Sequence, residues 1–91
     1  MTEARKRALA EAKAKGVKLD RHSLTASEIR EVIRETALRP ADREIAVMRY
    51  CRCLKPGEIA ELMSYDERTI RRRIAVISAR LCLTLLRMVY S

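Results

Sequence analysis

The sequence contains few of the residues from which catalytic and metal sites are built. Its 91 residues include a single histidine, His22, and three cysteines, Cys51, Cys53 and Cys82. A structural zinc site uses four Cys or His ligands in two closely spaced groups, and this set has no second group. Glycine occurs only twice, so a glycine-rich phosphate loop is absent. We therefore expect no enzyme activity, no metal and no cofactor.

Aromatic residues and long apolar runs are also scarce. Phenylalanine and tryptophan are missing, and the aromatic residues are Tyr50, Tyr65 and Tyr90. Proteins that bind single-stranded nucleic acids stack the bases on aromatic side chains, so this composition argues against that class. No apolar run reaches the length of a membrane-spanning helix, and the N-terminus lacks the apolar core of a signal peptide. We expect a cytoplasmic protein that has no membrane partner.

Positive charge is what the chain has in excess. Its 20 lysines and arginines against 12 acidic residues give a net charge of +8. Such an excess favours an acidic partner, and because aromatic residues are so few we expect that partner to be double-stranded DNA. A chain of this length buries only a modest core, which favours association with a second copy.

Hydrophobic periodicity predicts an all-α fold, in one small domain that follows a basic leader. Residues 1–22 are rich in alanine, lysine and arginine, and they form either a frayed helix or a solvated arm that touches phosphates. Residues 23–91 form the predicted domain. Its first helix begins with a capping box at Thr25 and Glu28, and a second amphipathic helix begins at Pro40.

Two further helices, separated by a short turn, are predicted in residues 56–77. Pro56 fits the first turn of a helix, the segment Ser64–Asp66 interrupts the apolar pattern, and another helix begins at Glu67. This order is typical of a helix-turn-helix motif, and arginines stand at the start of its second helix. The alternative is an ordinary helical hairpin with a solvated arginine face. The apolar stripe of the second helix consists of Ile70, Ile74, Ile77 and Leu81.

Three segments at this spacing resemble region 4 of bacterial sigma factors and the related helix-turn-helix of LuxR-type regulators. They are Leu38–Tyr50 (LRPADREIAVMRY), Glu58–Met63 (EIAELM) and Arg68–Arg72 (RTIRR), and the resemblance covers about half of the chain. Because region 4 reads the upstream promoter hexamer, the resemblance implies a recognition helix that lies in the major groove. The turn glycine of the family is Ser64 here. Carried over by position, the base-reading residues are Glu67, Arg68, Arg71 and Arg72.

These observations predict a sequence-specific duplex DNA-binding regulator of transcription. Nothing resembles the sigma region that melts DNA, so a regulator of the phage or mobile-element type fits better than a complete sigma factor. Arginine can donate two hydrogen bonds to guanine, and glutamate can accept one from cytosine. For Arg43, Arg49 and Lys55 a purely solvated role is the alternative to a phosphate contact. The predicted phosphate contacts are Arg43, Arg49, Lys55, Thr69 and Arg73.

Two other functions are alternatives to sequence-specific DNA binding. Folds of the region 4 type also bind RNA polymerase and anti-sigma proteins, so the chain is alternatively a protein-interaction module with little DNA affinity of its own. The other alternative is a basic protein that binds RNA or DNA without sequence preference. Competition with scrambled duplex and with RNA separates the three functions.

The C-terminal helix has more apolar surface than one small domain can cover. One stripe, which begins at Ile74, covers the helix-turn-helix core, and a second apolar row lies beside it. We therefore predict a homodimer that buries the second row and reads a palindromic site. The alternative is that the N-terminal helices cover this row and the protein stays monomeric. The row consists of Val76, Leu83, Leu86 and Tyr90.

Overall fold

Helices make up most of the chain that the structure describes. The computed structural model describes residues 2–4, 6–7 and 24–90, the last of them by its backbone alone. The predicted all-α fold is confirmed, and no strand occurs in these ranges. Most of the basic leader predicted for residues 1–22 lies outside the described residues. The elements are α2 (Ala26–Glu35), α3 (Pro40–Ala46), the π-helical turn η1 (Val47–Cys51), α4 (Pro56–Met63) and the long α5 (Glu67–Tyr90).

Helix α2 begins with the capping box that the sequence predicts. The Thr25 hydroxyl accepts a hydrogen bond from the Glu28 backbone N–H (3.2 Å), and the Glu28 carboxylate accepts one from the Thr25 N–H (2.9 Å). Leu24 and Ile29, on either side of this cap, are both buried. A cap of this kind stabilises a helix by about 1 kcal/mol. Local residues alone therefore determine where α2 starts.

The end of α2 is held by a residue far away in the sequence. The helix stops at Glu35, because the chain turns at Thr36 and buries the Thr36 side chain. The hydroxyl of Thr36 lies 2.6 Å from the Val32 carbonyl and 2.7 Å from the hydroxyl of Thr84 on α5. The buried hydrogen bond between Thr36 and Thr84 joins the end of α2 to α5.

Helix α3 is tied to its neighbours through two arginines. Arg43 donates hydrogen bonds to the carbonyls of Ile33 (3.0 Å) and Thr36 (3.1 Å), at the end of α2 where carbonyls lack a partner within the helix. Arg73 on α5 forms an ion pair with Asp42 (2.9 Å), whose side chain is only 16% exposed. Both guanidinium groups therefore hold helices together in the free protein.

Helix α3 widens into the π-helical turn η1 before the chain reverses. The Arg52 N–H donates to the Val47 carbonyl (3.0 Å), five residues earlier, and Cys53 then adopts a positive φ of 59°. Arg49 donates to the Leu54 carbonyl (3.1 Å) and so closes the loop. The sequence predicted one amphipathic helix through this region, because a single wide turn leaves no distinct mark on the apolar periodicity.

A left-handed turn joins α4 to α5. Ser64 adopts φ 60° and ψ 40° at the end of α4, and the Tyr65 N–H donates back to the Ala60 carbonyl (3.0 Å). Glycine is the usual residue in this conformation, since a β-carbon there raises the energy by about 1–2 kcal/mol. Helix α5 then begins, and the Ile70 N–H donates to the Asp66 carbonyl (3.1 Å). The predicted helix, turn and helix are all present.

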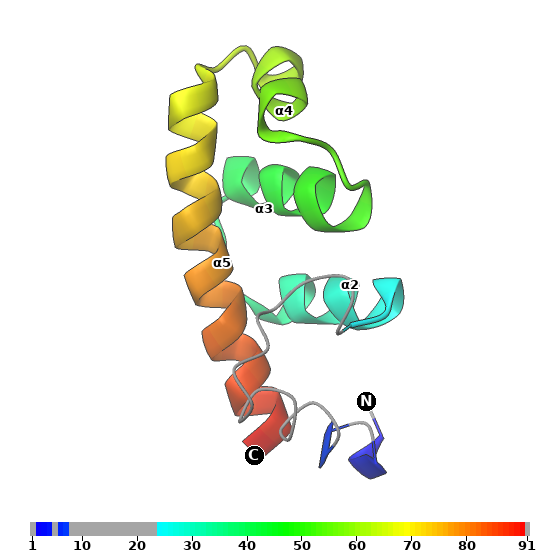
Figure 1. Cartoon of the computed structure of the whole chain (residues 1–91). Helices are drawn as coiled ribbons and strands as arrows, with labels where there is room; N and C mark the ends of the chain where they lie inside the picture. Colours follow the sequence, from blue (N-terminus) through cyan, green and yellow to red (C-terminus); the bar gives the residue numbers. More distant parts are fainter. Residues whose placement is uncertain (1, 5, 8–23, 91) are drawn as a thin grey trace.

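Helices α2, α3 and α4 lie one after another along the same side of α5 (Figure 1). Among the described residues the other side of α5 is uncovered, and Val76 and Leu83 there are 53% and 61% exposed. Helix α5 therefore has one face in the core and one apolar face in solvent. The largest fully buried side chains are Val32, Ile45, Ile59, Ile70, Ile77 and Leu81.

Candidate nucleic-acid interface

Arg68 and Arg72 are exposed on the first turns of α5. They are four residues apart and so share one face of the helix. Neither side chain has a hydrogen-bond or ion-pair partner within the part of the chain that the structure describes. Ile70 on the opposite side is fully buried, which holds the arginine face outward. Each guanidinium offers five N–H donors, so this face presents two cations that are ready to bind an acceptor.

The other two predicted base readers, Glu67 and Arg71, pair with each other. Oε2 of Glu67 accepts a hydrogen bond from Nε of Arg71 (2.9 Å) and forms an ion pair with Nη2 at the same distance. The Glu67 side chain is 52% exposed and that of Arg71 63% exposed, and an exposed pair at this spacing stabilises a helix by only about 0.3–0.5 kcal/mol. All four predicted readers thus lie at the exposed start of α5, as one ion pair and two arginines that have no partner among the described residues.

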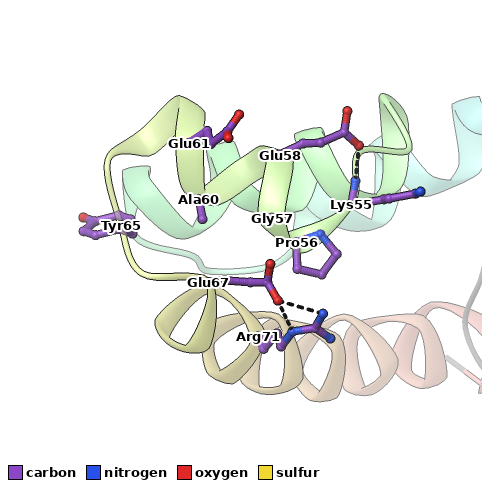
Figure 2. A pocket seen from close by; sticks show the side chains of 9 residues that line it. All are labelled: Lys55, Pro56, Gly57, Glu58, Ala60, Glu61, Tyr65, Glu67 and Arg71. Atoms are coloured by element: carbon purple, nitrogen blue, oxygen red, sulfur yellow. Dashed lines mark hydrogen bonds and ion pairs between the residues drawn. The ribbon is translucent and has the colours of Figure 1, made fainter.

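An open cleft of about 620 Å³ lies between α4 and the start of α5 (Figure 2). Glu58 and Glu61 line it from α4, and the Glu58 carboxylate accepts a hydrogen bond from the backbone N–H of Lys55 (2.9 Å). Both acidic and basic side chains line the opening, which suits neither an apolar ligand nor a simple anion. No group of His, Cys, Asp and Glu in the described ranges is arranged to hold a metal ion. The remaining lining residues are Lys55, Pro56, Gly57, Ala60, Tyr65, Glu67 and Arg71.

Gly57 is a site residue that the sequence analysis missed. A Cβ atom at this position would lie 2.7 Å from Oε1 of Glu67, which is closer than real Cβ contacts come. One signal in the sequence pointed to this residue, because Gly57 lies near the start of a predicted helix, where no turn requires a glycine. The contact itself joins two helices, so no local pattern could reveal it.

Three of the arginines predicted to contact phosphates have partners inside the protein. Arg43 binds carbonyls at the end of α2, Arg49 closes the η1 loop, and Arg73 pairs with a carboxylate on α3. Because these guanidinium groups hold the fold together, a phosphate would have to compete with their partners, and the three predicted contacts stay predictions; the proposed phosphate contacts are limited to residues without such a role. Lys55 is exposed before α4 and Thr69 is half-buried on α5, and both stay in that set.

The apolar row predicted for dimerisation lies largely on the uncovered face of α5. Val76 and Leu83 are exposed and Leu86 is half-buried, whereas the side chain of Tyr90 lies outside the described residues. Two small residues that the prediction did not include, Ala75 and Ala79, are exposed on the same face of α5.

No helix among the described residues has the length and apolar character needed to cross a membrane.

Comparisons with known proteins found nothing similar: no protein-family model, curated protein or solved structure matches the chain. The resemblance to sigma-factor region 4 and to LuxR-type regulators therefore stays a prediction from the sequence. Function is inferred from the geometry and chemistry of α4 and α5.

Proposed function

We propose that the protein is a sequence-specific regulator of transcription that binds duplex DNA with the start of α5 in the major groove. The observation that carries the proposal is the exposed pair Arg68 and Arg72, which has no partner among the described residues, on the second helix of a helix-turn-helix arrangement. The major groove admits an α-helix, and an arginine can donate two hydrogen bonds to O6 and N7 of one guanine. A net charge of +8 attracts the chain to phosphates of any sequence.

The rigidity of α5 supports this role. Ile70 and Ile77 are 0% and 1% exposed and belong to the core that α5 shares with α3 and α4. A reading side chain on a rigid helix loses less conformational freedom on binding than one on a loop. Lys55 and Thr69 are the proposed phosphate contacts, which set the register of the helix on the duplex without reading its sequence.

We also propose that two copies associate through the uncovered face of α5. Val76 and Leu83 are more than half exposed, and Arg80, the one charged residue between them in sequence, donates to the Ala37 carbonyl (3.2 Å). A second copy presents the same apolar row, and isologous dimers are the commonest assembly of soluble proteins. Such a dimer would present two reading helices to a palindromic site.

Affinity for duplex DNA is expected to fall steeply as salt is added. Each neutralised phosphate releases counterions, so log affinity should decrease with log salt by about 0.9 per contact. Fluorescence anisotropy with a duplex selected from a random pool measures this slope, with scrambled duplex and RNA as competitors. Affinity that is independent of salt up to physiological ionic strength contradicts the mechanism. Equal competition by the scrambled duplex contradicts sequence-specific reading alone.

Light scattering is expected to give twice the mass of one chain at high micromolar concentration. Leu83→Lys should convert the dimer to a monomer, because it places a charge in the middle of the apolar face. Leu62→Lys is the matched control, since Leu62 is 59% exposed on α4 and lies outside the row. A monomeric wild type, or a dimer that survives Leu83→Lys, would mean that this face is not the interface.

One observation favours the alternative of a protein-interaction module that binds RNA polymerase or a sigma or anti-sigma partner. Leu62 and Tyr65, near the turn between α4 and α5, are 59% and 43% exposed. Large apolar side chains exposed in this way are candidates for a contact with another protein. If this alternative holds, the chain selects no sequence from a random duplex pool. It then binds core RNA polymerase, and Leu62→Asp loses that binding.

A further inference from the structure

The Glu67 carboxylate is in contact with both helices of the motif (Figure 2). Its Oε2 accepts a hydrogen bond from Nε of Arg71 (2.9 Å), one turn further along α5, and lies 2.9 Å from Nη2 of the same guanidinium in an ion pair. Its Oε1 lies where a side chain at position 57 of α4 would begin, 2.7 Å from a Cβ atom built on Gly57. Ion pairs at this spacing are common on helices, but this carboxylate also lies against the neighbouring helix.

The approach of Glu67 explains the glycine at position 57. Gly57 is the second residue of α4, and its φ lies outside the positive range in which glycine is favoured. Alanine is preferred to glycine in a helix, because glycine loses more conformational freedom on folding. Because Gly57 has no side chain, the Glu67 carboxylate has room to lie beside Arg71.

The pairing determines which edge of the Arg71 guanidinium can meet DNA. A guanidinium has five N–H donors in a planar fork. The Glu67 carboxylate accepts from Nε and lies 2.9 Å from Nη2, so it occupies the edge of the group that these two nitrogens form. Both donors on Nη1 and the outer donor on Nη2 remain, and this end of the fork matches the O6 and N7 acceptors of guanine.

We propose that Glu67 is a positioning residue that presents Arg71 to guanine and does not itself read a base. The inference rests on the proposed function of α5 as a recognition helix, and it replaces the expectation that Glu67 accepts from cytosine. Held by Glu67, the guanidinium of Arg71 has one orientation toward the base edges. Without that partner, the long flexible side chain reaches phosphates on any sequence. Glu67 therefore lowers general affinity and raises specificity.

Three variants of the full chain test this role. Glu67→Gln weakens the hold on Arg71 by removing the charge, whereas Gly57→Ala keeps every charge and displaces the carboxylate by its Cβ atom. Glu61→Gln is the matched control, because Glu61 lines the same cleft and Arg71 pairs with Glu67 instead. The Glu67 side chain is 52% exposed and can move aside, so Gly57→Ala should keep the wild-type circular dichroism spectrum.

Binding is measured for the duplex that the wild type selects and for duplexes with each base pair replaced in turn. Glu67→Gln and Gly57→Ala should each lower the preference for guanine about five- to tenfold, at the same base pair as Arg71→Ala. Both glutamine variants should bind mixed-sequence duplex about fivefold more tightly, since each removes one negative charge near the phosphates. Glu61→Gln should keep the base preference.

The outcomes separate this inference from the proposed function. If the wild type selects a sequence and both Glu67→Gln and Gly57→Ala keep its base preferences, Glu67 does not position Arg71. If Glu67→Gln loses a preference for cytosine at a base pair that Arg71→Ala still reads, Glu67 reads a base directly and the inference is wrong. Uniform weakening on all duplexes assigns Glu67 a structural role only. A wild type that selects no sequence overturns the proposed function, and the inference with it.

Discussion

Removing Arg68 and Arg72 together is expected to remove most of the sequence-specific binding and to leave the fold intact. Both side chains are exposed and have no partner among the described residues, so Arg68→Ala with Arg72→Ala deletes no contact that holds a helix in place. A bidentate arginine contact to guanine contributes about 1–3 kcal/mol, so the double variant should lose about 2–6 kcal/mol of binding free energy. Anisotropy titration with the selected duplex measures the loss, and circular dichroism checks the fold.

The matched control for this experiment lies on α2. Arg30 and Arg34 are also exposed and four residues apart, so Arg30→Ala with Arg34→Ala removes the same charge at the same spacing. The control variant should bind all duplexes somewhat more weakly and keep its sequence preference, because general attraction depends on charge and base reading depends on position. The reverse pattern, with preference lost only in the α2 variant, would place the reading face on another helix.

Replacing Ile70 by alanine is expected to destabilise the domain by about 2–5 kcal/mol. Ile70 is 0% exposed on α5, in the core shared with Ile45 and Ile59. A stability of about 0.05–0.15 kcal/mol per residue allows a chain of this size roughly 5–14 kcal/mol, so the substitution removes a large part of it. Thermal unfolding followed by circular dichroism should show a melting temperature lower by more than about 10 °C.

The comparison for Ile70→Ala is Leu62→Ala, which truncates an apolar side chain that is 59% exposed on α4. A substitution at such a position usually changes stability by less than about 0.5 kcal/mol. If the two variants melted at the same temperature, Ile70 would not lie in the core that positions the arginine face, and the orientation of α5 would have to be revised.

The starts of the helices could be predicted from the sequence, because local residues determine them. Thr25 and Glu28 form their capping box within one helical turn. Pro40 and Pro56 stand at the beginning of α3 and α4, where a missing N–H has no cost. The interruption at Ser64 marked the end of α4, although a serine in the left-handed conformation is less common than a glycine. Each signal acts over a few residues, which a linear sequence displays.

The partners of the arginines could not be predicted in this way. Arg43, Arg49 and Arg73 have the same local appearance in the sequence as Arg68 and Arg72, namely basic residues in helical segments. Which carbonyl or carboxylate each of them reaches depends on the packing of helices and on the rotamer that the packing allows. The close approach of Glu67 to Gly57 could not be predicted for the same reason, because it depends on how α4 and α5 pack. The sequence thus located the candidate readers on one helix and did not reveal which of them are paired.

Helix α5 joins the arginine face and the apolar row in one element that has no glycine or proline between Glu67 and Tyr90. Each residue of an α-helix advances the axis by about 1.5 Å and turns it by about 100°. The phase angle between Arg72 and Leu83 is therefore set by the number of residues that separate them. A single inserted residue would rotate one face away from the other by more than a quarter turn, and a whole heptad would nearly restore the alignment. In the proposed dimer, the length of α5 would thus determine the spacing between the two DNA half-sites. It would also determine the angle at which each arginine face enters the major groove.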